Sequence, residues 1–158
     1  MTVTDIDENI WVYQGNGMLL RYDPYADTYE TFETGITTYD YETRLGYDHP
    51  THSIYFGGFG ASNLQRYDIT SGVTTELTSH PESQLNDIFC SDRSGHLYAA
   101  GGSGGTTLWQ YVIDTDSWRE ITPHPVDHGN NGSCTVSEEG YLYIEPGDLS
   151  TIYRLPLY

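Results

Sequence analysis

Two histidine–proline pairs are the part of this sequence that comes nearest to a metal-binding pattern. His80-Pro81 and His124-Pro125 lie at equivalent positions of an internal repeat, and His128 follows closely. Imidazole nitrogens are common zinc ligands, so a site of two or three histidines is one interpretation. No ligand-spacing rule supports it, and solvated histidines that precede turn prolines explain both pairs more simply. We therefore predict no bound metal and no cofactor.

A glycine-rich segment contains a candidate nucleophile. Gly101 to Gly105 has the G-x-S-x-G pattern of a nucleophile elbow, with Ser103 at its centre. That motif needs a helix after the turn to expose the serine, whereas the residues that follow, Leu108 to Val112, indicate a strand. We therefore predict that Ser103 is not catalytic and that the protein is not an enzyme.

Short acidic runs are candidates for holding a hard cation through their oxygen atoms. Asp5 to Glu8 and Asp114 to Asp116 are two of them. Neither has the glycine and the terminal glutamate of a calcium-binding loop. We expect both runs to be solvated acidic turns.

Three of the six arginines occupy one position of the repeat. They are Arg21, Arg66 and Arg154, and Gln110 stands at this position in the remaining unit. Recurrence favours a structural role, in which the arginine stem covers apolar neighbours and the guanidinium pairs with a carboxylate on the adjacent strand, such as Glu76. The alternative is a ring of arginines that binds an anionic ligand.

The charge of the chain restricts its partners. The formal net charge is −17 at pH 7, and all six basic residues are arginine. Such a field repels phosphate groups, so we exclude nucleic acid as a partner. An acidic, lysine-free and threonine-rich composition resembles that of proteins from halophilic archaea and their viruses.

An apolar strand recurs four times along the chain. Its copies begin at Ile10, Ile54, Leu97 and Leu142. A partner strand follows in phase, with one shared position at Leu19, Leu64, Leu108 and Ile152 and another at Tyr22, Tyr67, Tyr111 and Leu155. A third strand follows in three units, and a further strand precedes each unit. Four short strands in every 44 or so residues are typical of β-propeller blades.

The strand sequences indicate packing on both faces. In Ile10 to Tyr13 and Ile54 to Phe56, apolar side chains occupy both faces, which a sheet needs only when both are covered. No segment has the caps and the 3.6-residue periodicity of a helix. We predict an all-β fold in which the 15 tyrosines, 4 phenylalanines and 3 tryptophans supply much of the buried area.

One repeat resembles the kelch family of β-propellers. Gly101-Gly102 is followed by Tyr111 and then by Trp118, and that family places a double glycine, a tyrosine and a tryptophan in this order. Looser copies without the tryptophan contain Tyr67 and Tyr22. The resemblance extends over nearly the whole chain. It implies a β-propeller in which these aromatic residues are structural, and it says little about activity.

The strand count predicts one β-propeller-type domain, residues 1–158, with repeats at about 7–50, 51–93, 94–138 and 139–158. It has three full four-stranded blades and a truncated fourth blade. Rings usually have roughly four to eight blades. The chain is therefore either an arc completed by oligomerisation or a small four-bladed ring. We favour the arc, because its two uncovered apolar blade faces would require association.

The two cysteines are expected to remain unpaired. Cys90 and Cys134 lie on equivalent strands of neighbouring units but one residue out of register, so we expect their side chains on opposite faces. We predict two buried thiols and no disulfide.

Loops at one end of the predicted blades are the candidate binding surface. The candidate ligand-face residues on them are Phe59, His80, His124, His128, Asn130 and Asn131. We expect a non-enzymatic binding or structural module that forms homo-oligomers through its blades and presents these loops to a protein or a glycan. The alternative is a propeller enzyme that acts on a carbohydrate or a related substrate, which would need a convergent cluster of acids, bases or ligands.

The N-terminal residues lack the basic start and the apolar run of a signal peptide, and no stretch is long enough for membrane insertion. We expect a soluble protein that belongs to the cytoplasm of a halophile, to its surface or to a virion.

The large negative charge predicts that salt stabilises the fold. Self-repulsion opposes compaction at low ionic strength, whereas about 1 M salt shortens the Debye length to about 3 Å. We expect the melting temperature to rise between about 0.1 M and about 2 M KCl in a differential scanning fluorimetry series. A flat or falling dependence would remove the halophile interpretation.

Overall fold

The computed structural model describes residues 2–36, 43–58, 63–82, 85–101, 107–123, 132–147 and 151–157. These residues form fifteen β-strands, and the helical element among them is a three-residue 3₁₀ turn, Ile113–Thr115. The prediction of an all-β fold is confirmed for this part of the chain. Within the same ranges, no helix is long and apolar enough to cross a membrane.

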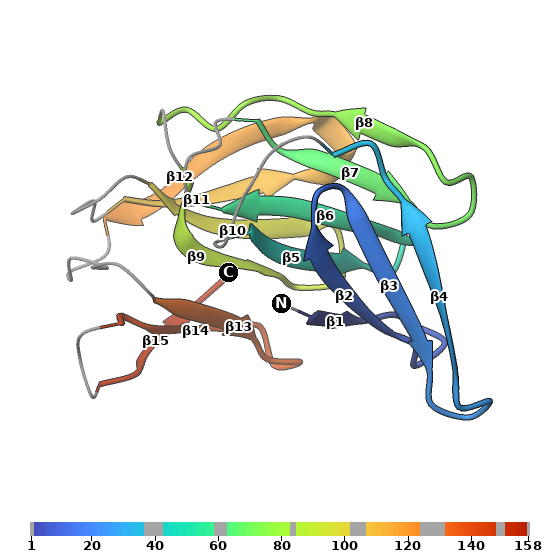
Figure 1. Cartoon of the computed structure of the whole chain (residues 1–158). Coiled ribbons are helices and arrows are strands. Elements are labelled where there is room, and N and C mark those ends of the chain that lie inside the picture. The colour runs from blue at the N-terminus through green and yellow to red at the C-terminus, as the bar shows by residue number, and fades with distance from the viewer. Residues whose placement is uncertain are drawn as a thin grey trace.

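The strands form four antiparallel sheets, in each of which neighbouring strands follow one another along the chain (Figure 1). The first sheet contains β1 (Thr2–Thr4), β2 (Ile10–Gly15), β3 (Met18–Asp23) and β4 (Thr28–Glu33). The second contains β5 (Thr43–Asp48), β6 (Ser53–Gly58), β7 (Gln65–Asp68) and β8 (Thr74–Glu76). The third contains β9 (Leu85–Ser91), β10 (His96–Gly101), β11 (Thr107–Val112) and β12 (Ser117–Pro123). The fourth contains β13 (Ser133–Val136), β14 (Tyr141–Glu145) and β15 (Tyr153–Pro156), so the described strands give three four-stranded sheets and one three-stranded sheet.

Tyrosines at one repeat position fix the turn between the third and fourth strands of a sheet. The Tyr22 hydroxyl donates to Asp27 Oδ1 at 3.0 Å, and the Tyr111 hydroxyl donates to Asp116 Oδ1 at 2.5 Å. Both acceptors have left-handed backbone, with φ of 52° and 46°, and the second sheet has Gly72 at this position with φ of 70°. Aspartate and glycine tolerate this conformation in hairpin turns.

Three hydrophobic clusters fill the spaces between consecutive sheets. The first and second sheets bury Trp11, Leu19, Ile54 and Phe56 between them. The second and third sheets bury Tyr55, Leu64, Leu97 and Ala99, and the third and fourth bury Tyr98, Ala100, Leu142 and Ile144. Successive residues of β6 and β10 therefore belong to different cores, because neighbours along a strand point to opposite faces. None of the three clusters joins the fourth sheet to the first.

The first strands of the four sheets, here called the inner strands, are β1, β5, β9 and β13. They converge near the middle of the molecule, while the later strands of each sheet lie farther out (Figure 1). β5 packs against β1 and β9, and β13 packs against β9. Two glycines permit this approach. A Cβ on Gly46 of β5 would lie 3.3 Å from Ser91 Cβ of β9, and a Cβ on Gly132, just before β13, would lie 2.8 Å from Ile88 Cγ1 of β9.

Cys90 and Cys134 form a disulfide between the third and fourth sheets, so the prediction of two unpaired thiols is wrong. The register offset itself is present, since Cys90 pairs with Tyr98 while Cys134 pairs with Ile144, one repeat position farther along. The error was to assume that side chains on opposite faces of two neighbouring sheets point away from each other. When sheets stack, the faces that meet are opposite faces of the repeat, so the offset brings the two side chains together. Their Cα atoms lie 5.7 Å apart, within the range that a disulfide requires.

We expect reduction of this disulfide to destabilise the protein. In the chain-entropy model, closing a loop of sequence separation 44 stabilises the fold by up to about 4 kcal/mol. Urea unfolding with and without reductant measures the loss, and the Cys90→Ala/Cys134→Ala variant is the control that should not respond to reductant. Equal stability of the wild type in both conditions would contradict the expectation.

Candidate functional site

A cavity of about 600 Å³, here called the central cavity, lies where the inner strands meet. Residues of β1, β5, β9 and β13 all line it. Its size falls within the range of small-molecule sites, which is roughly 300 to 1,000 Å³. The central cavity is therefore our candidate functional site.

Hydroxyl groups from the first and fourth sheets line two sides of the central cavity. Thr2 and Thr4 pair with β2 residues on the face of the first sheet that points away from the second sheet. Ser133 and Thr135 lie on the face of the fourth sheet that points away from the third sheet. All four residues line the cavity, so two short rows of hydroxyls border the same space.

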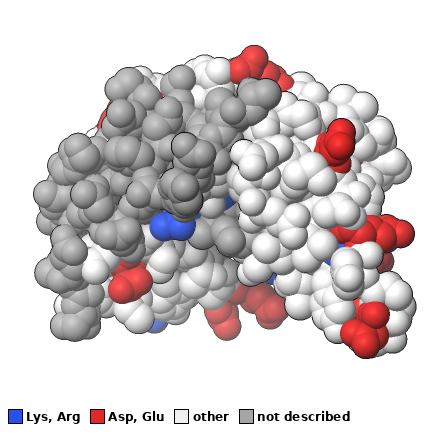
Figure 2. All heavy atoms as spheres, viewed as in Figure 1, with Lys and Arg blue, Asp and Glu red and all other residues white. Residues whose placement is uncertain are grey.

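Arg44 and Arg93 are the charged side chains that line the central cavity within the described ranges. No aspartate or glutamate of these ranges lines it, although the chain has 23 acidic residues. Arg44 is half-buried on β5, and Arg93 is exposed in the loop between β9 and β10. Figure 2 shows few basic atoms on this face of the molecule and several separate acidic groups. Among the described residues that line the central cavity, the charged ones are therefore both arginines.

A second cavity of about 270 Å³ adjoins the central cavity beside β9 and β13. Ser91, Arg93 and Thr135 line both spaces, and Asp92 and Glu138 line only the second. Asp92 and Glu138 therefore line the second cavity alone, whereas Arg93 lines both cavities.

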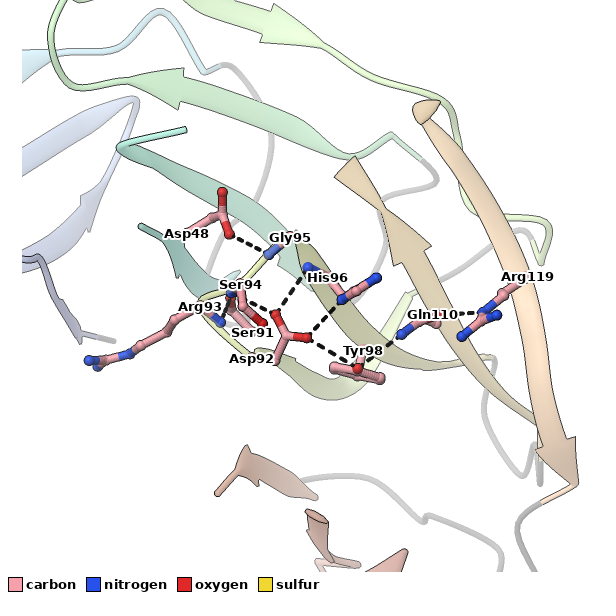
Figure 3. Close-up of polar contacts among 10 residues, drawn as sticks. All are labelled: Asp48, Ser91, Asp92, Arg93, Ser94, Gly95, His96, Tyr98, Gln110 and Arg119. Carbon is pink, nitrogen blue, oxygen red and sulfur yellow. Dashed lines mark hydrogen bonds and ion pairs between the residues drawn. The ribbon is translucent and has the colours of Figure 1, made fainter. Parts of the chain in front are cut away.

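The loop that holds Arg93 is fixed by its neighbour Asp92 (Figure 3). Asp92 Oδ1 accepts hydrogen bonds from the backbone N–H groups of Ser94 at 2.8 Å and His96 at 3.0 Å. Its Oδ2 lies 2.8 Å from His96 Nδ1 and accepts from the Tyr98 hydroxyl at 3.4 Å. Burial raises the pKa of Tyr98 to about 12, which keeps this hydroxyl a neutral donor. The Arg93 side chain extends away from this network (Figure 3).

Asp5 and Asp48 occupy the same repeat position in the first and second sheets, and they are only 4% and 0% exposed. Asp5 Oδ2 accepts from Trp11 Nε1 at 2.7 Å, and its Oδ1 accepts from the backbone N–H of Asn9 at 2.9 Å. Asp48 Oδ1 accepts from the backbone N–H of Gly95 in the third sheet at 2.8 Å (Figure 3). The expectation of a solvated first acidic run is wrong at Asp5, whose carboxylate is buried and fully hydrogen-bonded.

The second acidic run also includes a structural carboxylate. Asp116 Oδ1 accepts from the backbone N–H of Thr78 at 2.8 Å, which joins the second sheet to the third. Asp114 and Thr115, by contrast, are exposed, as a solvated turn predicts.

His80 is buried at 4% exposure, so the expectation of a solvated histidine is wrong for this residue. Its ring packs edge-on against Trp118 at 4.6 Å and Trp109 at 5.6 Å between ring centroids. Its Nδ1 accepts from the backbone N–H of Glu82 at 3.2 Å, and Glu82 Oε1 in turn accepts from Trp109 Nε1 at 3.0 Å. Desolvation by burial lowers the pKa of His80. His80 thus holds the connection between the second and third sheets against β11 and β12.

The remaining candidate ligand-face residues lie outside the described ranges. They are Phe59, His124, His128, Asn130 and Asn131, together with the candidate nucleophile Ser103. Within the described ranges, no group of three or more histidine, cysteine, aspartate or glutamate residues is arranged to hold a metal ion.

The repeated arginines make contacts within their own sheets rather than in the central cavity. Arg21 pairs with Glu30 on the adjacent strand at 2.6 Å, and its guanidinium lies 5.8 Å from the ring centroid of Trp11. The guanidinium of Arg154 lies 4.7 Å from the ring centroid of Tyr141. These contacts support the structural interpretation of this repeat position.

The third sheet reaches a similar arrangement with different residues. Gln110 replaces the repeated arginine, and Arg119 on the adjacent strand donates a hydrogen bond to its Oε1 (Figure 3). In the second sheet, Glu76 accepts a hydrogen bond from Asn63, and Arg66 Nε is buried without a hydrogen-bond partner.

Comparison with known proteins adds no assignment to this geometry. No protein-family model matches the sequence, and no curated protein matches it.

We expect the stability of the protein to fall on mild acidification because of His80. Burial lowers its folded-state pKa below 6.5, so the unfolded chain takes up the proton first as the pH decreases. The free energy of unfolding should therefore decrease from about pH 6.5 down to the folded-state pKa and gain nothing from this residue at higher pH.

Thermal unfolding of the wild type and of His80→Asn at pH values between about 7.5 and 5 measures this contribution. The asparagine retains a hydrogen-bond acceptor for the Glu82 N–H but does not titrate. An acid-induced loss of equal size in both proteins would assign the effect to other groups.

Proposed function

We propose that this protein is a non-enzymatic binding module built from four kelch-like β-propeller blades with an open seam between the fourth and the first. Three features support the proposal. Each sheet is a meander whose first strand is innermost, consecutive sheets pack face to face, and the inner strands border one cavity. These features are typical of propeller blades around an axis.

The seam is the observation that supports a binding role best. Val12 and Leu20 form a cross-strand pair on the outer face of the first sheet, and both are half-buried. The outer face of the fourth sheet presents Tyr141 and Tyr143, which are also half-buried. Half-exposed apolar and aromatic groups on a sheet face are typical of surfaces that associate.

A second copy of the chain is the proposed occupant of the seam. Most soluble homo-oligomers are symmetric, and a two-fold axis would place the seam of one protomer against the seam of the other. The net charge of −17 opposes this contact in dilute salt, whereas molar salt screens it. In a halophile the assembled module would present its loops to a protein or a glycan, as a virion or cell-surface component.

We expect the wild-type protein to be a dimer or a larger oligomer in about 2 M KCl, as measured by light scattering. Leu20→Asp should yield the monomer, because it places a charge on the half-buried seam face. Val73→Asp is the matched control, since Val73 is 55% exposed in the turn between β7 and β8. A monodisperse, cooperatively folded wild-type monomer of 17.8 kDa would contradict assembly and favour the small four-bladed ring.

A further inference from the structure

We propose that the outer face of the fourth sheet of one copy packs on the outer face of the first sheet of a second copy. The outer faces are the two sheet faces that lie outside the three hydrophobic clusters. This inference rests on the proposed function and identifies which face meets which. It follows from a residue pattern that all three clusters share and that the two outer faces complete.

Each cluster receives one aromatic side chain from the second strand of the earlier sheet. These residues are Trp11, Tyr55 and Tyr98, which occupy one repeat position and are at most 1% exposed. Tyr143 occupies the same position in the fourth sheet, and its cross-strand partner is the repeated Arg154. Tyr143 is only half-buried and lies on the outer face. The fourth sheet therefore carries the aromatic half of a further cluster.

The later sheet contributes three side chains to each cluster, two from its second strand and one from its third strand. In chain order these sets are Ile54, Phe56 and Tyr67, then Leu97, Ala99 and Tyr111, then Leu142, Ile144 and Leu155. The first sheet carries Ile10, Val12 and Tyr22 at these positions, and Ile10 pairs with Tyr22 as Ile54 pairs with Tyr67. All three residues are half-buried. The first sheet therefore carries the other half of a further cluster.

Opposite outer faces complete the pattern, whereas like faces do not. Trp11, the second-strand aromatic of the first sheet, is already buried against the second sheet, and its ring lies 6.5 Å from that of Tyr67 between centroids. Tyr143 and Tyr22 are the equivalents of these two residues. We therefore expect Tyr143 of one copy to pack beside Tyr22 and Ile10 of the other, as aromatic and apolar side chains do in the three clusters.

A second copy supplies this partner because the first and fourth sheets of one chain lie apart. Figure 1 shows them on opposite sides of the view, with the two ends of the chain between them. β1 packs on β5, β5 on β9 and β9 on β13, whereas β1 and β13 line the central cavity from two sides. In a two-fold dimer a residue that contacts its partner is contacted in the same way in return, so two identical junctions form. Both bury apolar surface, which salt does not screen.

Two variants and their mixture test which faces meet, by sedimentation velocity in about 2 M KCl. Val12→Asp places a charge on the outer face of the first sheet, and Tyr143→Arg places one on the outer face of the fourth. In each variant alone, both junctions contain an altered residue, so we expect dimerisation at least about tenfold weaker than in the wild type. An equimolar mixture gives a heterodimer with one unaltered junction, and the other junction joins charges of opposite sign. We therefore expect the heterodimer to form in preference to either homodimer.

Matched controls introduce the same charges away from the outer faces. Val73→Asp and Tyr25→Arg alter turn residues that are 55% and 77% exposed, and they should dimerise as the wild type does. Thermal unfolding shows whether each variant keeps a cooperative fold. Val12→Ser and Tyr143→Ser remove the same contacts without a charge and repeat the comparison if a charged variant does not fold.

The outcomes separate this inference from the proposed function. Normal dimerisation of Val12→Asp or of Tyr143→Arg alone would show that like faces meet and would overturn the inference. A mixture without heterodimer would overturn it as well, and in both cases the assembly of the wild type would stand. A monomeric wild type would remove the proposed assembly and this inference together.

Discussion

The fold depends on the burial of side chains on both faces of the second strand in the two middle sheets. Ile54 and Tyr55 are adjacent in the chain, both are fully buried, and each belongs to a different core. Full burial of one such side chain stabilises a fold by about 1.5 to 3 kcal/mol, and here every consecutive pair of sheets repeats it. A single sheet cannot bury two faces by itself, so each of these two middle sheets needs a neighbour on either side. The order of the sheets follows from this constraint, and the first and fourth sheets each keep one face outside the three cores.

Close approach of the inner strands is the second consequence. Gly132 has no room for a Cβ beside Ile88, and the Cys90–Cys134 disulfide joins the same two strands covalently. Both features hold the fourth sheet, the one with three strands, against the third. The last sheet is therefore fixed on one face by a core and a covalent bond, while its other face borders the central cavity.

Much of the fold could be predicted, because the pattern of apolar side chains along one strand can be recognised without knowledge of the strands around it. The recurrence of Ile54-Tyr55 and Leu97-Tyr98 reports two buried faces without knowledge of the neighbours. The disulfide could not be predicted in this way. It depends on which faces of different sheets meet, and the residue pattern of a single strand does not contain that information. The same limit applies to Thr2 and Thr135, whose common cavity exists only once four sheets are placed.

The aspartates that accept several hydrogen bonds from the backbone and from side chains show a different limit. Asp5, Asp48 and Asp92 recur with nearly the spacing of the strands, and this spacing was the available signal for a structural role. In a chain with 23 acidic residues, composition favours a solvated carboxylate at any single position. The spacing alone therefore does not identify the three aspartates as structural. His80 was misjudged for a related reason, since the tryptophans that bury it belong to another sheet.

Salt affects the charges on the surface and the direct contacts within the fold differently, because these interactions act over different distances. The acidic surface acts through many separated charges, and these interactions decay within about 3 Å in 1 M salt. Contacts within the fold, such as the hydrogen bonds that Asp92 accepts in the loop of Arg93, are direct, so screening weakens them less than it weakens the long-range repulsion. Salt therefore reduces the surface repulsion more than it reduces these direct contacts. A net charge of −17 is compatible with a compact fold under these conditions, because salt screens the surface repulsion that opposes folding and leaves the buried contacts largely unscreened.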